Sequence, residues 1–186
     1  MSILNRRELL IGGGAAMMAL SACGNPIGGA GGATIDSRVD QTLNFMFSQY
    51  PGTRDLDSKA VGKLVIPVVT EAGLGFGGSY GRGALRIGQS TVDYYSATAL
   101  SGGLQIGAQQ FSHVLFFMTE DALMEFRTSN GWALGADAEY VLNTEAENIR
   151  AETTTSLAPV IAVIFAQAGL RVGATVEGTK YTRIIP

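Results

Sequence analysis

Short β-prone runs separated by glycine fill the middle of the chain and restrict its fold more than any other feature. Six such runs lie at 63–69, 75–80, 84–87, 91–98, 104–110 and 114–118. The 25 glycines of this 186-residue chain are more than a helical protein needs, and they suit a chain that turns often and brings backbones close together. The spacing predicts a sheet of antiparallel hairpins.

Helices and further strands are expected on both sides of these runs. Apolar residues recur at helical spacing from Ile35 to Tyr50, until Pro51-Gly52 ends the pattern. A second helix is expected over 120–129, with Thr119 as its cap. Further strands are expected over 133–142, 160–166, 170–176 and 181–185. The fold class is therefore α+β, mostly antiparallel β: a strongly curved sheet or partly closed barrel with an N-terminal helix and one or two short helices.

The N-terminal helix admits two interpretations. Its apolar stripe is expected to pack on the domain's own sheet, and the alternative is that it lies in a membrane interface. The polar face carries Asp36, Arg38 and Asp40 rather than a row of lysines, which favours packing on the sheet.

Residues 1–22 have the pattern of an export signal. Arg6-Arg7 precede an apolar stretch from Leu9 to Leu20, which is shorter than the roughly 20 residues that span a bilayer. The twin arginine resembles a Tat signal, although adjacent arginines also occur in Sec leaders. Leu20-Ser21-Ala22-Cys23 resembles the bacterial lipobox, so Cys23 is expected to be lipidated; the alternative is a cysteine discarded with the leader.

The expected lipidation and cleavage indicate where the mature protein is located and how the chain is divided into a linker and a domain. Gly24 follows the cysteine instead of an aspartate, which favours the periplasmic face of the outer membrane over retention at the inner membrane. Residues 23–33 are expected to be the lipidated cysteine and a flexible glycine-rich linker. Residues 34–186 are expected to form a single domain, because their length suits one core of ordinary size.

Several motifs along this domain match one known family in order. They are the runs at 59–67 and 71–85, Tyr94-Tyr95-Ser96, 103–109, 116–135 with its Asn-Gly-Trp turn, 169–170 and 176–183. Together they resemble the SYLF domain over nearly all of 35–186. The resemblance implies lipid binding, because eukaryotic members bind phosphoinositide membranes and fungal members also bind actin. Actin is not an expected partner here, since the chain is acidic, has no SH3 domain and carries an export signal.

Catalysis and cofactors are not expected. His113 is the only histidine and Cys23 the only cysteine, so no His/Cys metal cluster is available and none is predicted. His113 is expected to be a strand histidine with a satisfied hydrogen bond rather than a catalytic base. Gly73, Gly75 and Gly78 fit the dinucleotide spacing GxGxxG, but strand sequence follows where a helix is required, so they predict a bulge or a close backbone approach.

Basic residues supply the remaining candidate site. Arg82 and Arg86 are four residues apart on one expected strand and so share a face. The candidate lipid-binding patch comprises Arg54, Lys59, Lys63, Arg82 and Arg86; the alternative is a scattered solvated surface. The formal net charge of −3 argues against nucleic acid as a partner. The sequence thus predicts a non-catalytic envelope lipoprotein that binds anionic lipid, or alternatively a periplasmic scaffold that docks on another envelope protein.

Overall fold

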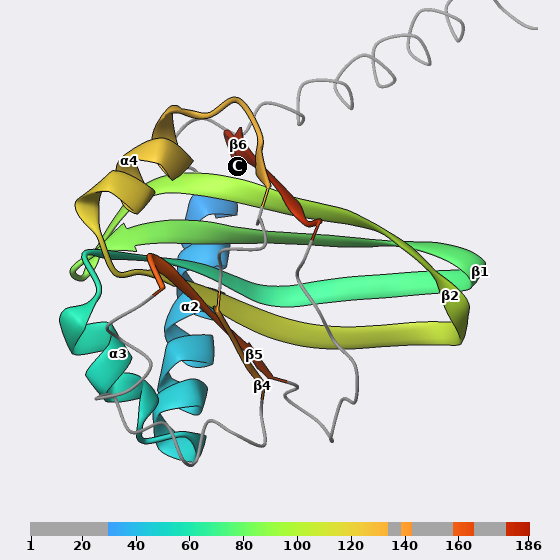
Figure 1. Ribbon diagram of the computed structural model, residues 1–186, viewed down its shortest axis with the longest axis horizontal. Helices are drawn as coiled ribbons and strands as arrows, with labels where there is room; N and C mark the ends of the chain where they lie inside the picture. Colours follow the sequence, from blue (N-terminus) through green and yellow to red (C-terminus); the bar gives the residue numbers. More distant parts are fainter. Residues whose placement is uncertain (1–29, 134–138, 143–157, 166–177) are drawn as a thin grey trace, which may run out of the picture.

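The computed structural model describes residues 30–133, 139–142, 158–165 and 178–186, and no side chains within 74–76, 101–108 or 139–142. Its elements run α2 (Ala30–Gln49), α3 (Thr53–Lys59), β1 (Gly62–Ile87), β2 (Ser90–Phe117), α4 (Glu120–Thr128), β3 (Trp132–Ala133), β4 (Glu139–Leu142), β5 (Val160–Phe165) and β6 (Lys180–Ile184) (Figure 1). The expected signal peptide, Cys23 and the expected strand at 170–176 lie outside the described residues.

One long ribbon replaces the six short strands expected from the sequence. β1 and β2 pair antiparallel from Gly62↔Phe117 to Ile87↔Ser90, and only the turn at Gly88, with φ of 60°, separates them. The expected breaks were wrong, because the glycines mark irregularities inside continuous strands. Register shifts lie between Ile66 and Val69, Leu74 and Phe76, and Leu85 and Arg86. The predicted bulge in the segment from Gly73 to Gly78 is confirmed by the second of these shifts.

The ribbon bends back on itself. Val65, Ile66 and Val68 lie directly against Gly81 and Gly83 of the same strand, and a Cβ built on Gly83 would lie 1.8 Å from the Val65 carbonyl oxygen. Such an approach of two backbones requires glycine. The bend at the middle of the ribbon extends beyond the helices (Figure 1). We call this bend, with residues 77–82 of β1 and 96–100 of β2 that lie beside it, the outer end of the ribbon, or ribbon end.

Each half of β2 pairs with one further strand besides β1. β5 pairs with β2 over Ser112–Phe117 in register, and β6 pairs over Tyr94–Thr98. β3 adds to β6 and β4 adds to β5, so the order is β3-β6-β2-β5-β4 with β1 beside β2. Only β4 and β5 run parallel among the described strands, which are otherwise antiparallel. The curved half-barrel of the α+β prediction is confirmed.

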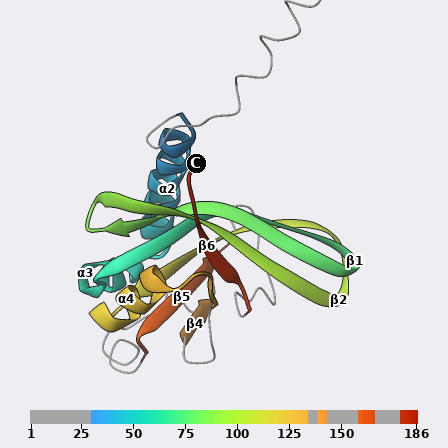
Figure 2. The same cartoon turned by 90° about the horizontal axis from the view of Figure 1, so that it is seen from above.

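α2 covers the outer face of this sheet (Figure 2). Its buried apolar residues Ile35, Val39, Leu43 and Met46 pack against Val65, Ala84, Val114 and Phe116 of the ribbon and against β5. Burial of an aliphatic side chain of this size contributes about 1.5–3 kcal/mol. Packing on the domain's own sheet is therefore confirmed for the apolar stripe. The helix begins at Ala30, so the last four residues of the expected linker are helical.

α4 lies on the other side of the ribbon from α2 (Figure 2). The predicted cap is confirmed, because the backbone N–H of Ala122 donates to the Thr119 hydroxyl at 3.3 Å. Leu123 and Phe126 are buried in the inner core, where Phe126 contacts Trp132 with ring centroids 5.3 Å apart. Trp132 is partly buried against this core. α3 agrees with the expected one or two short helices, but its position was not predicted, because seven residues with two buried side chains carry little periodic signal.

His113 lies in the core between the two halves of the sheet, 1% exposed. Its Nε2 is 2.9 Å from the Tyr181 hydroxyl, so one ring nitrogen of the expected strand histidine is hydrogen-bonded as predicted, whereas the buried Nδ1 has no hydrogen-bond partner among the described residues. Burial disfavours the imidazolium and lowers the pKa of His113 from 6.5 to about 3.

This pKa predicts an acid-sensitive fold. The unfolded chain takes up a proton near pH 6.5 that the folded chain rejects, so the free energy of unfolding falls below that pH and stops falling through this group near pH 3. The expected slope is about 1.4 kcal/mol per pH unit between roughly pH 6 and 4. Denaturant titrations of the wild type and of His113→Gln, which keeps a hydrogen-bonding group near Tyr181, measure it. Equal slopes in the two proteins would contradict the assignment.

Candidate functional site

Two of the five basic residues predicted as a lipid-binding patch are buried in internal ion pairs. Lys63 is 6% exposed and its Nζ pairs with the Asp57 carboxylate of α3. Arg86 is 7% exposed, and its Nη1 lies 2.7 Å from Asp40 of α2. A buried cation requires a nearby counter-charge, and both pairs join a helix to β1. The expectation that Lys63 and Arg86 contribute to a surface patch is therefore corrected.

The pairing of Arg86 is part of a larger polar junction at the start of α2. Asp36 lies 3.9 Å from Arg86 and accepts hydrogen bonds from the hydroxyls of Thr91, at 2.7 Å, and Tyr94, at 2.8 Å. Burial and then the hydrogen bond to Asp36 raise the pKa of Tyr94. The junction fixes α2 on the ribbon.

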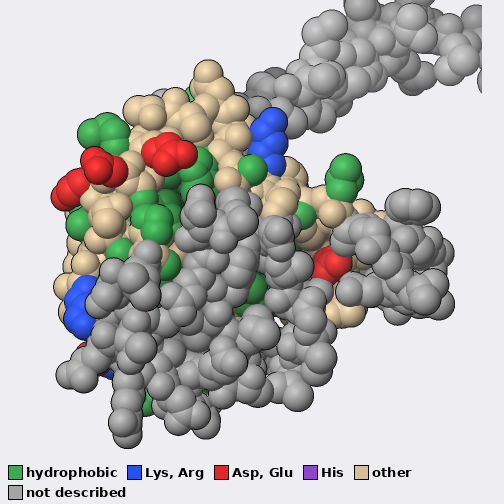
Figure 3. Space-filling view, in the orientation of Figure 1, with side chains coloured by type: hydrophobic (Ala, Val, Ile, Leu, Met, Phe, Trp, Pro, Cys, Tyr) green, Lys and Arg blue, Asp and Glu red, His purple; other side chains and the backbone are tan. Residues whose placement is uncertain are grey.

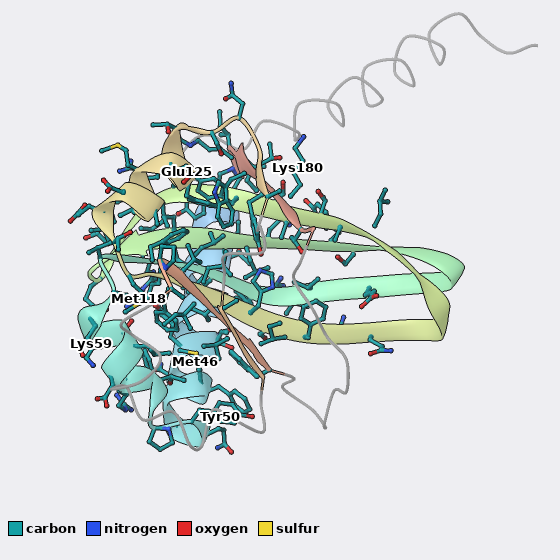
Figure 4. The ribbon with its side chains drawn as sticks, in the orientation of Figure 1. Met46, Tyr50, Lys59, Met118, Glu125 and Lys180 are labelled. Carbon is teal, nitrogen blue, oxygen red and sulfur yellow. The ribbon has the colours of Figure 1, made fainter. Side chains whose placement is uncertain are left out.

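The other three predicted basic residues are exposed but do not meet at one place. Arg54 stacks over the Phe47 ring at 5.0 Å, and Lys59 ends α3 at one corner of the molecule, across from Lys180 of β6 (Figure 4). Arg82 lies on β1. The basic side chains visible in Figure 3 likewise stand at separate places among the described residues. Lipid binding by these residues stays a prediction.

A second basic group joins β2, α4 and β6. Arg127 and Arg183 lie 3.4 and 3.3 Å from the same Asp93 oxygen. Arg183 also lies over the Tyr95 ring at 6.0 Å, and burial raises the pKa of that tyrosine. Both arginines have a counter-ion within the protein, so the group is partly neutralised.

A cleft between α2 and β1 brings together Arg82 and Arg38. It consists of two adjoining cavities of about 350 and 600 Å³ that share Arg38, Pro67 and Val68 as walls. The smaller is lined by Gly31, Thr34, Ile35, Arg38, Pro67, Val68, Thr70, Tyr80, Gly81 and Arg82. The larger adds Gln41, Thr42, Phe45 and Gln110.

The local sequence explains why the cleft is open there. Thr34, Arg38 and Gln41 follow one another at helical spacing on a stripe beside the buried face of α2, so they point along the edge of the packed interface. The register shift between Ile66 and Val69 bends β1 at Pro67, and the Ser112 hydroxyl donates to the Pro67 carbonyl at 2.6 Å. Pro67 and Val68, at this register shift, line the cleft opposite α2.

The cleft differs from the other basic positions in its electrostatics. Arg38 and Arg82 are both exposed, and neither has an ion pair with another residue in the described part of the chain. The two guanidinium groups supply donors that suit phosphate or carboxylate, whereas the hydroxyl of Thr34 donates to the Ala30 carbonyl at 2.7 Å and that of Thr70 accepts from the Gln110 amide at 3.3 Å. Sequence reasoning identified Arg82 but treated Arg38 only as part of a polar helix face. The stripe at 34, 38 and 41 was the available signal.

Within the described ranges no group of three or more His, Cys, Asp and Glu side chains could hold a metal ion. None of the helices described here combines the length and hydropathy needed to cross a bilayer.

Residues 98–183 match the family model Ysc84, described as "Las17-binding protein actin regulator". The matched segment begins within β2 and ends within β6. It therefore includes the last part of β2, α4, β3, β4 and β5. No curated protein matches the chain in sequence.

Proposed function

The chain carries a SYLF domain, and from this premise we propose that it is a non-catalytic envelope lipoprotein whose domain binds the anionic head groups of membrane lipids. The family supports a lipid-binding or actin-binding domain. Lipid is the better choice for this chain, because its leader resembles an export signal and Cys23 follows a lipobox-like segment. Actin would not be met on that side of a bacterial membrane.

The observation that carries the proposal is the pair of arginines in the α2–β1 cleft. Arg38 and Arg82 line one cavity with Thr34 and Thr70, while Lys63 and Arg86 are neutralised inside the protein. A head-group phosphate would supply the negative charge that the described part of the chain does not place beside this pair. The cleft therefore takes the role that the sequence analysis gave to a five-residue patch.

The expected lipid anchor at Cys23 also favours the α2–β1 cleft as the membrane-facing surface. If Cys23 is acylated, residues 24–29 separate it from Ala30, the first residue of α2, and the distance between these two residues is at most about 25 Å when the segment is fully extended. Gly31 and Thr34, in the first turns of α2, line the cleft. The tether would thus hold the cleft close to the bilayer and raise the local lipid concentration without any new contact.

Replacing both cleft arginines should weaken membrane binding. Each exposed basic residue near an anionic bilayer contributes about 1 kcal/mol, so Arg38→Gln/Arg82→Gln should bind anionic vesicles about 30-fold more weakly. Co-sedimentation of the full chain carrying Cys23→Ser, with and without the double change, measures this free of the anchor. The difference should shrink at high salt, where exposed charges are screened.

The matched control is Arg54→Gln/Lys59→Gln on α3, which removes the same charge away from the cleft and should change binding much less. Loss of binding in this control rather than in the cleft variant would move the site to α3. No binding of the Cys23→Ser chain to any anionic vesicle would contradict lipid binding and favour a protein partner in the envelope.

A further inference from the structure

The outer end of the β1–β2 ribbon exposes two large apolar side chains next to the cleft. Leu100 is 96% exposed and Tyr80 is 53% exposed. Gly78 pairs with Leu100 and Tyr80 pairs with Thr98, so the two side chains are diagonal neighbours on one face of the ribbon. Figure 1 shows this end of the ribbon projecting away from the helices.

This face of the ribbon continues into the cleft. Every second residue of β1 lies on the same face, and this face carries Tyr80, Arg82 and Ala84. Ala84 is packed in the core beneath α2. Tyr80 and Arg82 both line the smaller cavity of the cleft. Apolar, aromatic and cationic side chains therefore follow one another from the ribbon end toward α2.

The charges of the ribbon end fit one kind of partner. Residues 77–82 and 96–100 contain Arg82 and no acidic residue, although the whole chain is acidic and Glu71 lies earlier on the same strand. Next to a tyrosine lie a nearly fully exposed leucine and two arginines that have no ion pair among the described residues. This combination matches the boundary of an anionic bilayer, where acyl chains, carbonyls and phosphates lie within a few ångströms of one another.

We propose that the ribbon end inserts Leu100 and Tyr80 into the acyl boundary of an anionic membrane while Arg38 and Arg82 contact its phosphates. The inference rests on the proposed lipid binding and adds an orientation: the ribbon end points into the membrane and α4 remains in water. The expected tether at the start of α2 lies on the same side as the cleft, which is consistent with that orientation.

A single-cysteine label tests the orientation cleanly, because Cys23 is the only cysteine of the chain. An environment-sensitive fluorophore is placed on Leu100→Cys in the full chain carrying Cys23→Ser. The control is Met124→Cys on α4, a side chain that is 63% exposed on the other side of the ribbon. Vesicles of phosphatidylglycerol and phosphatidylcholine should shift the emission to the blue at position 100 and leave position 124 unchanged. Nitroxide-labelled lipids should quench only the label at position 100.

The outcomes separate the two proposals. Binding in co-sedimentation with a water-exposed label at position 100 would overturn insertion and leave lipid binding standing. No binding would overturn both. A blue shift at position 100 without vesicles that grows with protein concentration would assign the face to a second copy of the chain, and would also overturn insertion.

A substitution supplies an independent measure. Leu100→Ser should weaken partitioning into anionic vesicles at least tenfold, the effect expected for the loss of one buried leucine. Met124→Ser is the matched control and should partition like the parent. Both positions are exposed, so both variants are expected to fold. Equal partitioning of the two variants would contradict insertion.

Discussion

Replacing Gly83 with alanine is expected to destabilise the protein by about 3 kcal/mol or more, the upper range for an overpacked interior. The added Cβ would lie 1.8 Å from the Val65 carbonyl oxygen and 2.8 Å from both the Val65 carbonyl carbon and Ile66 Cδ1. Two of these three atoms belong to the backbone of a paired strand, so no side-chain rotation relieves the clash. The two segments of β1 must separate, which disturbs the packing of Ile66 on the inner face of the sheet and of Val65 on the face under α2. Equilibrium denaturation in urea measures the loss.

Gly78→Ala is the matched control for this change. It lies on the same strand, and the nearest atom to its new Cβ is the Ala99 carbonyl oxygen at 3.4 Å, an ordinary contact. Its free energy of unfolding should stay within about 1 kcal/mol of the wild type. If Gly83→Ala were as stable as this control, the close crossing within β1 would be wrong.

Cys23→Ser is expected to abolish acylation and to release most of the protein from the membrane. The lipobox-like segment offers one thiol for lipid attachment, and the chain has no other cysteine. Without the acyl chains, only the cleft and the ribbon end would hold the protein to lipid. Surface contacts of this kind bind lipid far more weakly than multiple acyl chains do. Metabolic labelling with a fatty acid and fractionation of cells measure both effects.

The control for this prediction is Ser21→Ala, which keeps a small residue ahead of the cysteine. It should be acylated and recovered with membranes like the wild type. Continued acyl labelling and membrane recovery of the Cys23→Ser variant would remove the lipoprotein interpretation and, with it, the tether that brings the cleft to the bilayer.

The sheet was predictable as a fold class but not as a topology. β-prone residues identified nearly every strand, yet glycine breaks at positions such as Gly81 and Gly83 resemble turns in a sequence. They are in fact points where one backbone lies against another, as the contacts to Val65 and Val68 show. Only tertiary contact distinguishes the two cases. Helix positions were better predicted, because α2 and α4 each bury a periodic stripe.

The sequence predicted that basic residues form the candidate site, but it did not predict which basic residues these are. Strand alternation correctly put Arg82 and Arg86 on one face, but α2 covers that face unevenly. It neutralises Arg86 with Asp40 and leaves Arg82 open beside Arg38. A sequence does not reveal which acidic residue of a distant helix will meet a given arginine. Lys63 likewise pairs with Asp57 of a short helix that the pattern did not predict.

The most direct test of lipid binding at the cleft is a two-dimensional NMR titration of the full chain carrying Cys23→Ser with a short-chain phosphatidylglycerol below its micelle concentration. The account predicts that the largest shifts in the backbone amide signals cluster at Thr34, Arg38, Thr70 and Arg82, on opposite walls of the cleft. They should be lost in the Arg38→Gln/Arg82→Gln variant. Shifts centred on α3 or on the Arg127–Arg183 group, or no shifts at all, would contradict it.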